Sequence, residues 1–223
     1  MKRVALIHTV KSVYDSFPGQ LREALGLPAS ELKIHNIMDD FLADDPADIG
    51  EFSTVNKARL YNDIKSAEIT GADLIVVTCS TLSPTVAEIR PFVKTQIVTI
   101  DEAMAAEAVK NGTRIGLLAT ANSTVNASKF KLEEEARKIG KTVEIEVSHD
   151  EDAIRALKAG DVEKHNALVV RMAEQLHNPD VMVLAQASMA PMEAPLRKQF
   201  GIPVYSSPAL CIAQVKEILE AQK

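Results

Sequence analysis

The sequence has no tryptophan, few other aromatic residues and no excess of positive charge, and these absences exclude several classes of partner. Aromatic residues make up 4% of the 223 residues, and 25 lysines and arginines are outnumbered by 31 aspartates and glutamates, for a formal net charge of -6. Nucleic-acid binders need basic surfaces, and binders of single strands also use aromatic stacking platforms. We therefore expect a small-molecule substrate and no nucleic-acid partner.

Long apolar runs and a dense set of cysteines are also missing. The apolar stretches are far shorter than the ~20 residues that span a bilayer, and the amino-terminal run leads into YDSFPGQ without the cleavage site of a secretory signal. Two cysteines, Cys79 and Cys211, cannot build a disulfide framework. Free thiols are typical of a reducing compartment. These features predict a cytoplasmic protein with no membrane contact.

Motifs for nucleotides and metal ions are absent from the sequence as well. The chain contains neither GxGxxG nor GxxxxGK[ST], the fingerprints of dinucleotide and nucleoside-triphosphate sites. Zinc sites of the usual kinds need closely spaced histidines and cysteines. Four of the histidines lack such spacing, namely His35, His149, His165 and His177. The sequence therefore predicts no metal site and gives no support for a nucleotide cofactor.

Short apolar runs alternate along the chain with segments of helical period. Four runs are apolar on both faces, as buried parallel strands are, and they cover residues 4–10, 73–80, 114–121 and 181–188. Four further short strands are expected at 31–37, 96–100, 142–148 and 202–207. Charged helical segments lie between them, at 56–71, 126–140 and 151–176. This alternation predicts an α/β fold with parallel sheets.

The two halves of the chain resemble each other. ADLIVVTCSTLSP aligns with PDVMVLAQASMAP, and the register holds without a gap as far as the helical segments EAMAAEAVK and ALCIAQVKE. RVALIHTV likewise aligns with RIGLLATA. Chance similarity between apolar strands is the alternative, but two matches in the same order favour a duplication. We therefore expect two lobes, 1–105 and 106–206, related by a pseudo-two-fold axis, each running strand, helix, strand, helix, strand, strand, helix.

Ligands of open α/β sheets bind at the carboxyl ends of the strands, and Cys79 lies at such an end. Ser80 and Thr81 follow it, and a helix is expected to begin with Ser83 as N-cap and Pro84 at its first position. The amide groups of a helix start stabilise thiolates and bind carboxylates. The alternative is a buried structural cysteine. Cys211 lies among apolar residues at helical spacing and is interpreted as core.

The second half carries an amide where the first carries this thiol. Gln186 aligns with Cys79, and Ala187 and Ser188 follow it. A glutamine amide neither takes up nor releases a proton at neutral pH, so we expect a chemically one-sided site.

Polar residues also follow the first strand of each half. Thr120 precedes Asn122, Ser123 and Thr124, whose hydroxyl and amide groups suit a carboxylate ligand, although Ser123 or Thr124 can equally cap the next helix. The matching residues of the first half are His8 and Thr9. His8 either stabilises a thiolate or shuttles a proton at Cys79, or is a core histidine with satisfied hydrogen bonds.

The duplicated halves, VVTCSTLSP, the GLLATANST loop and VLAQASMAP resemble the Asp/Glu/hydantoin racemase superfamily over essentially the whole chain. This resemblance implies two Rossmann-like lobes with parallel four-stranded sheets and an active site between them. It also implies cofactor-independent chemistry in which one cysteine from each lobe acts on opposite faces of the α-carbon. The last helix, 207–223, would pack on the first lobe, and the chain would form a homodimer or a larger homo-oligomer.

The same resemblance assigns roles to particular residues. Cys79 matches the cysteine of the first lobe, and Thr81 and Thr120 match positions that hold the substrate carboxylate. Gln186 replaces the second cysteine, whereas inversion requires protonation from the face opposite to deprotonation. The second proton would then come from His8 or water.

We therefore expect a cofactor-independent racemase or isomerase that acts on a small carboxylate through Cys79. The alternatives are a decarboxylase or lyase acting on a malonate-like or hydroxy acid, which needs one proton donor, and a silent carboxylate-binding protein. The residues expected to bind substrate are Thr9, Ser80, Thr81, Thr120, Asn122, Gln186, Ala187 and Ser188.

Overall fold

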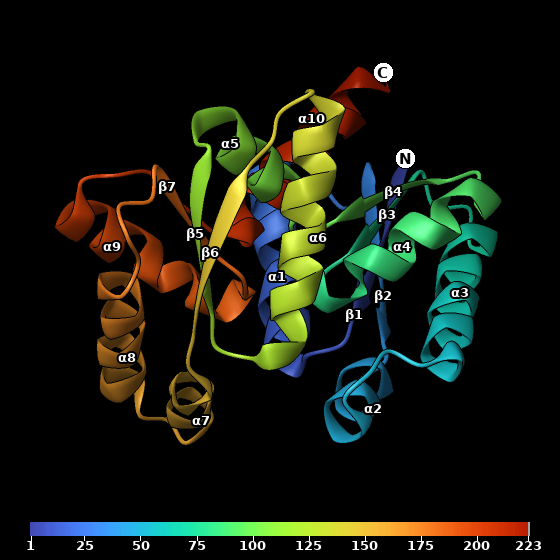
Figure 1. Ribbon diagram of the computed structural model, residues 1–223. Coiled ribbons are helices and arrows are strands. Elements are labelled where there is room, and N and C mark those ends of the chain that lie inside the picture. The colour runs from blue at the N-terminus through green and yellow to red at the C-terminus, as the bar shows by residue number, and fades with distance from the viewer. Residues whose placement is uncertain (223) are drawn as a thin grey trace. The chain divides into compact units, whose positions relative to one another are not determined.

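The computed structural model describes residues 1–222, which form two compact units (Figure 1). Unit 1 consists of Met1–Ile100 together with the segment from Ala209 onward, and unit 2 is Asp101–Pro208. Residue 105, the first expected boundary, falls inside helix α5 (Glu102–Asn111), which lies wholly in unit 2.

Unit 1 is built on a four-stranded parallel sheet in the order β2-β1-β3-β4. Its strands are β1 (Lys2–His8), β2 (Leu32–Met38), β3 (Leu74–Val77) and β4 (Gln96–Thr99). Its helices are α1 (Lys11–Leu25), α2 (Phe41–Ile49), α3 (Thr54–Ile69), the 3₁₀ turn η1 (Ser80–Leu82), α4 (Ser83–Ile89), the 3₁₀ turn η2 (Arg90–Phe92) and α10 (Ser207–Ala221), whose first two residues belong to unit 2.

Unit 2 repeats this architecture with a parallel sheet in the order β6-β5-β7-β8. Its strands are β5 (Arg114–Ala119), β6 (Glu144–His149), β7 (Val181–Leu184) and β8 (Val204–Tyr205). Besides α5, its helices are α6 (Asn122–Lys138), α7 (Glu151–Lys158), α8 (Val162–Glu174), η3 (Ala187–Met192) and α9 (Glu193–Phe200). The eight expected strands and the two four-stranded parallel sheets are confirmed.

The expected order of elements was wrong in two places. Two helices, rather than one, separate the second and third strands of each unit. In unit 2 the reason is that the helical stretch 151–176 is interrupted at Gly160. That glycine has a φ of 81° and closes α7, and Asp161 then caps α8 by accepting a hydrogen bond from the amide of Lys164. A helix also separates the third and fourth strands, since parallel neighbours need a crossover connection.

The core of each unit lies where helices cover both faces of its sheet. In Figure 1, α6 lies on one side of the β5–β6 pair and α8 lies on the other. The central strands are accordingly buried throughout, as in Leu74–Val77 of unit 1 and Val181–Leu184 of unit 2. Each of these strands ends two residues before a position singled out by the sequence, which is Cys79 in unit 1 and Gln186 in unit 2.

Candidate active site

Cys79 lies two residues after the last residue of β3 and begins a helical segment. It is the N-cap residue of η1 with extended backbone angles, so helical structure starts at Ser80 and the expected N-cap at Ser83 was wrong. The reason is that η1 runs straight into α4, which leaves Ser83 within the helical segment, with Pro84 in the first turn of α4. The free thiol of Cys79 is half-buried against the margin of the unit 1 core. Ser80 is buried, and Thr81 is half-buried.

The ends of β1 and β3 bring Cys79 close to Thr9. The two strands pair in parallel, and the amide of Thr78 donates to the carbonyl of Ile7 at 2.9 Å, which extends this pairing to the strand ends. Paired strands lie about 4.8 Å apart. Thr9 and Cys79 therefore occupy neighbouring positions at the carboxyl edge of the sheet.

His8 is fully buried, and both of its ring nitrogens are engaged within unit 1. Nε2 donates to Oδ1 of Asn36 at 3.1 Å, Nδ1 lies 2.8 Å from the hydroxyl of Thr78, and the ring of Tyr14 meets the imidazole edge-on at 5.4 Å. Burial lowers the pKa of His8, and the Asn36 hydrogen bond offsets part of that effect. These contacts favour the interpretation of His8 as a core histidine, whose hydrogen bonds hold the ends of β1, β2 and β3 together.

Thr9 carries a buried hydroxyl that has no hydrogen-bond partner. The next residue, Val10, is the N-cap of the 15-residue helix α1 and provides no capping side chain. The first amides of a helix need acceptors, and an anion can supply them. Thr9 and the start of α1 are therefore suited to a carboxylate.

Gln186 has the position in unit 2 that Cys79 has in unit 1, as the N-cap of a 3₁₀ segment after the third strand. Its Oε1 accepts from the amide of Thr120 at 3.0 Å, and its Nε2 donates to Oγ1 of Thr124 at 2.5 Å. The Thr124 hydroxyl in turn donates to the carbonyl of Ala121 at 2.7 Å. The amide of Gln186 thus closes the turn between β5 and α6.

The other predicted residues of unit 2 lie around this turn with different exposures. Thr120 is buried, and its hydroxyl has no hydrogen-bond partner. Asn122 and Ser188 are exposed, and Ala187 is half-buried. Ala121 is the N-cap of α6 and has no side-chain cap, so neither Ser123 nor Thr124 caps this helix.

An acidic pair next to His8 was missed by the sequence analysis. Asp39 follows β2, its amide donates to the carbonyl of His8, and its Oδ2 accepts from Nε of Arg59. The Oδ1 atom of Asp39 and the Oδ2 atom of Asp63 are both buried without an N–H donor. A protonated Asp63 carboxyl that donates to Asp39 satisfies both, and burial together with this hydrogen bond raises the pKa of Asp63 to about 6. The spacing of Arg59 and Asp63 on α3 suggests a pair, but nothing in the sequence connects them to Asp39.

The raised pKa of Asp63 predicts a pH-dependent stability. Between the unfolded pKa near 3.8 and the folded value of about 6, the unfolded chain loses this proton while the folded chain keeps it, so stability falls as the pH rises through that interval. The full shift is worth about 3 kcal/mol, which partial exposure reduces to about 1–2 kcal/mol. Asp63→Asn keeps a donor to Asp39 and should remove this dependence.

Urea titrations of both proteins at pH 4, 5, 6 and 7 measure the effect. The stability of wild type relative to Asp63→Asn should fall between pH 4 and 6. Parallel stability curves would show that the two carboxyls do not share a proton.

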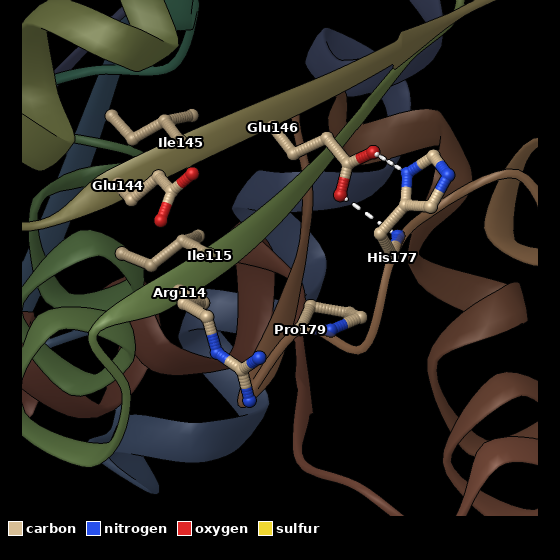
Figure 2. Close-up of a pocket in the computed structure, with 7 residues that line it drawn as sticks. All are labelled: Arg114, Ile115, Glu144, Ile145, Glu146, His177 and Pro179. Carbon is tan, nitrogen blue, oxygen red and sulfur yellow. Dashed lines mark hydrogen bonds and ion pairs between the residues drawn. The ribbon is translucent and has the colours of Figure 1, made fainter.

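A hollow of about 380 Å³ lies at the opposite, amino-terminal edge of the unit 2 sheet (Figure 2). Nδ1 of His177 lies 2.6 Å from Oε1 of Glu146, and this pairing raises the pKa of His177 and lowers that of Glu146. The residues that line the hollow are Arg114, Ile115, Glu144, Ile145, Glu146, His177 and Pro179. None of the predicted site residues lies there.

Residues 1–222 contain no group of three or more histidine, cysteine, aspartate or glutamate residues placed to hold a metal ion. No helix in this part of the chain is long and apolar enough to cross a membrane.

Comparison with known proteins extends this description. The chain is similar to a Picrophilus torridus aspartate racemase (19% identity, 98% of this chain and 94% of that chain, TM-score 0.72). It is similar to an aspartate racemase homologue from Pyrococcus horikoshii OT3 (23%, 100% and 100%, 0.65). It is also similar to a mutant of the Nocardia farcinica maleate cis-trans isomerase with a covalently bound succinylcysteine intermediate (15%, 98% and 93%, 0.58).

These likenesses concern the fold, and the family follows from the sequence itself. No curated protein sequence matches the chain. The model of the Asp/Glu/Hydantoin racemase family matches residues 8–215, which is most of its length. The chain therefore belongs to the Asp/Glu/hydantoin racemase family.

Proposed function

We propose that the protein is a cofactor-independent racemase or isomerase that acts on a small carboxylate through a single thiol, that of Cys79. The observation that carries the proposal is the difference between two equivalent positions. A free, half-buried cysteine begins the helical segment of unit 1, whereas the glutamine at this place in unit 2 is engaged by Thr120 and Thr124. Racemase and isomerase structures among the relatives support an activity of this class.

The reaction begins with the substrate carboxylate bound to the Thr9 hydroxyl and the first amides of α1. The sulfur of Cys79, as thiolate, takes the α-proton, so that a C–H bond breaks, an S–H bond forms and the electron pair moves into the carboxylate as an enediolate. Amide groups at the starts of α1 and η1 stabilise the charge that develops.

The intermediate then collects a proton at the α-carbon. Return from Cys79 restores the original enantiomer, and delivery from water on the other face gives its mirror image. Water is assigned this second role because both nitrogens of His8 are hydrogen-bonded and an amide stands at Gln186.

The test is a substrate panel in heavy water. The protein is incubated with single enantiomers of amino acids and hydroxy acids, and with substituted malonates, and α-deuteration and products are followed by NMR. Deuteration together with the opposite enantiomer is the expected result. A ligand that binds measurably but is neither deuterated nor converted would instead favour a silent carboxylate-binding protein.

Decarboxylation or carbon–carbon cleavage is the second candidate, and the engagement of Gln186 favours it. When a malonate loses carbon dioxide, the electron pair of the broken C–C bond forms the same enediolate, and protonation by Cys79 alone completes the reaction. The alternative is recognised in the same panel by release of carbon dioxide, or of a cleaved fragment from a hydroxy acid, without racemisation of any substrate.

Thr9→Val should separate substrate binding from stability. Valine keeps the shape of threonine and removes a buried hydroxyl without a partner, so the free energy of unfolding should stay the same or rise. The loss of a hydrogen bond to the substrate should raise KM about 3- to 10-fold.

Ser128→Ala is the matched control, because Ser128 also carries a buried hydroxyl without a partner and lies within α6. Its KM should be that of wild type. Equal KM values for Thr9→Val and wild type would place the carboxylate elsewhere.

A further inference from the structure

Three partly exposed apolar residues of unit 1 lie near Thr9 along the chain or across the sheet. Val10, Tyr14 and Met38 are 45%, 37% and 38% exposed. The amide of Tyr14 donates to the carbonyl of Val10, so these two side chains lie one helical turn apart on α1. Tyr14 also contacts His8, which pairs in register with Met38. We call these three residues the apolar wall.

The apolar wall adjoins the place proposed for the substrate carboxylate. Val10 is the N-cap of α1 and follows Thr9 directly, whereas Met38 is the last residue of β2. A carboxylate held at Thr9 and the first amides of α1 would therefore place its α-carbon and the attached substituent within reach of this wall.

The charges near this edge disfavour a second carboxylate on the substrate. Lys11 is paired with Asp15 at 2.8 Å, and Arg59 is paired with Asp39 and stacks on the ring of Phe41. Residues 39–51 contain six acidic residues and no lysine or arginine, namely Asp39, Asp40, Asp44, Asp45, Asp48 and Glu51. The corner between β2 and α2 therefore repels anions and leaves no nearby unpaired cation of its own to bind one.

We propose that the substrate is a monocarboxylate whose α-carbon carries an apolar substituent, and that Val10, Tyr14 and Met38 contact this substituent. The proposal rests on the proposed function for the position of the carboxylate, and it assigns the substrate class. Apolar contact area stabilises such a substituent, and the acidic corner discriminates against aspartate-like and glutamate-like side chains.

Binding and turnover test the proposal separately. Phenylacetate and succinate serve as binding probes, because α-proton exchange regenerates the same compound, and their Kd values are measured by calorimetry. Phenylalanine and leucine are compared with aspartate and glutamate in the deuterium-exchange assay. Phenylacetate should bind at least about tenfold more tightly than succinate, and the apolar amino acids should exchange faster than the acidic ones.

Met38→Lys supplies the structural control, because it adds a cation to the apolar wall. It should weaken phenylacetate about tenfold and strengthen succinate. Ile69→Lys makes the same change at the end of α3, where the side chain is 81% exposed, and should alter neither Kd.

The outcomes distinguish the two proposals. Succinate binding as tightly as phenylacetate, or Met38→Lys behaving like Ile69→Lys, would overturn the substrate class even if Cys79-dependent exchange occurs. The expected Kd values without exchange of any substrate would uphold the apolar wall and overturn the proposed function.

Discussion

Replacing Cys79 with alanine is expected to reduce α-proton exchange by about 10²- to 10⁴-fold, the contribution typical of a positioned general base. The thiol stands alone in this role, because both ring nitrogens of His8 are hydrogen-bonded and Gln186 provides only an amide. The free energy of unfolding should change little, since Cys79 is half-buried at the margin of the core. Exchange rates and urea titrations measure the two quantities on the same preparation.

Cys211→Ala is the matched control, because it removes the other cysteine of the chain. Cys211 is fully buried in α10, so this variant should lose stability through packing and keep its exchange rate at temperatures where it is folded. Exchange that survives in Cys79→Ala, or that disappears equally in folded Cys211→Ala, would contradict the assignment of the base.

Replacing Gln186 with leucine is expected to destabilise unit 2 by about 1–2 kcal/mol, because it leaves the amide of Thr120 and the hydroxyl of Thr124 without this partner. Urea titration measures the loss. Amide hydrogen exchange of Thr120 should also become faster, since the N–H then lacks its acceptor.

Gln186→Glu is the control for this substitution. A carboxylate at this position still accepts a hydrogen bond from the Thr120 amide. It can also accept one from the Thr124 hydroxyl, which in the wild-type structure donates to the carbonyl of Ala121. The loss of stability should therefore be smaller than in Gln186→Leu. Equal losses in the two variants would show that these hydrogen bonds do not stabilise the turn. A large rise in KM without any loss of stability would instead make Gln186 a substrate ligand.

The central strands could be predicted from the sequence because each is a short apolar run that is buried on both faces. The edge strands β2 and β6 contain polar residues among their apolar ones and are less buried. Helix boundaries depended on finer contacts. The 3₁₀ turn after Cys79 places the helical start at Ser80, although Ser83 and Pro84 have the residue types of a helix start. The helix between the third and fourth strands, which the sequence-based order left out, follows from the crossover connection that parallel pairing requires.

The repeat placed Cys79 and Gln186 at equivalent strand ends, but the contacts of these ends come from distant parts of the sequence. His8 is held by Asn36 and Thr78, and Asp39 is linked to Asp63. No local pattern reveals such partners. The roles expected for Ser80, Thr81, Thr120, Asn122, Ala187 and Ser188 stay predictions.

The most direct test of a mechanism with a single thiol base is the stereochemistry of α-proton exchange in heavy water. The experiment starts from one enantiomer of a substrate that the protein turns over. A base on one face returns its proton to that face, so α-deuterium should enter the starting enantiomer faster than the opposite enantiomer accumulates, and both processes should be lost in Cys79→Ala. Equal rates of deuteration and inversion would require a second acid on the other face, and exchange that persists in Cys79→Ala would place the base at another residue.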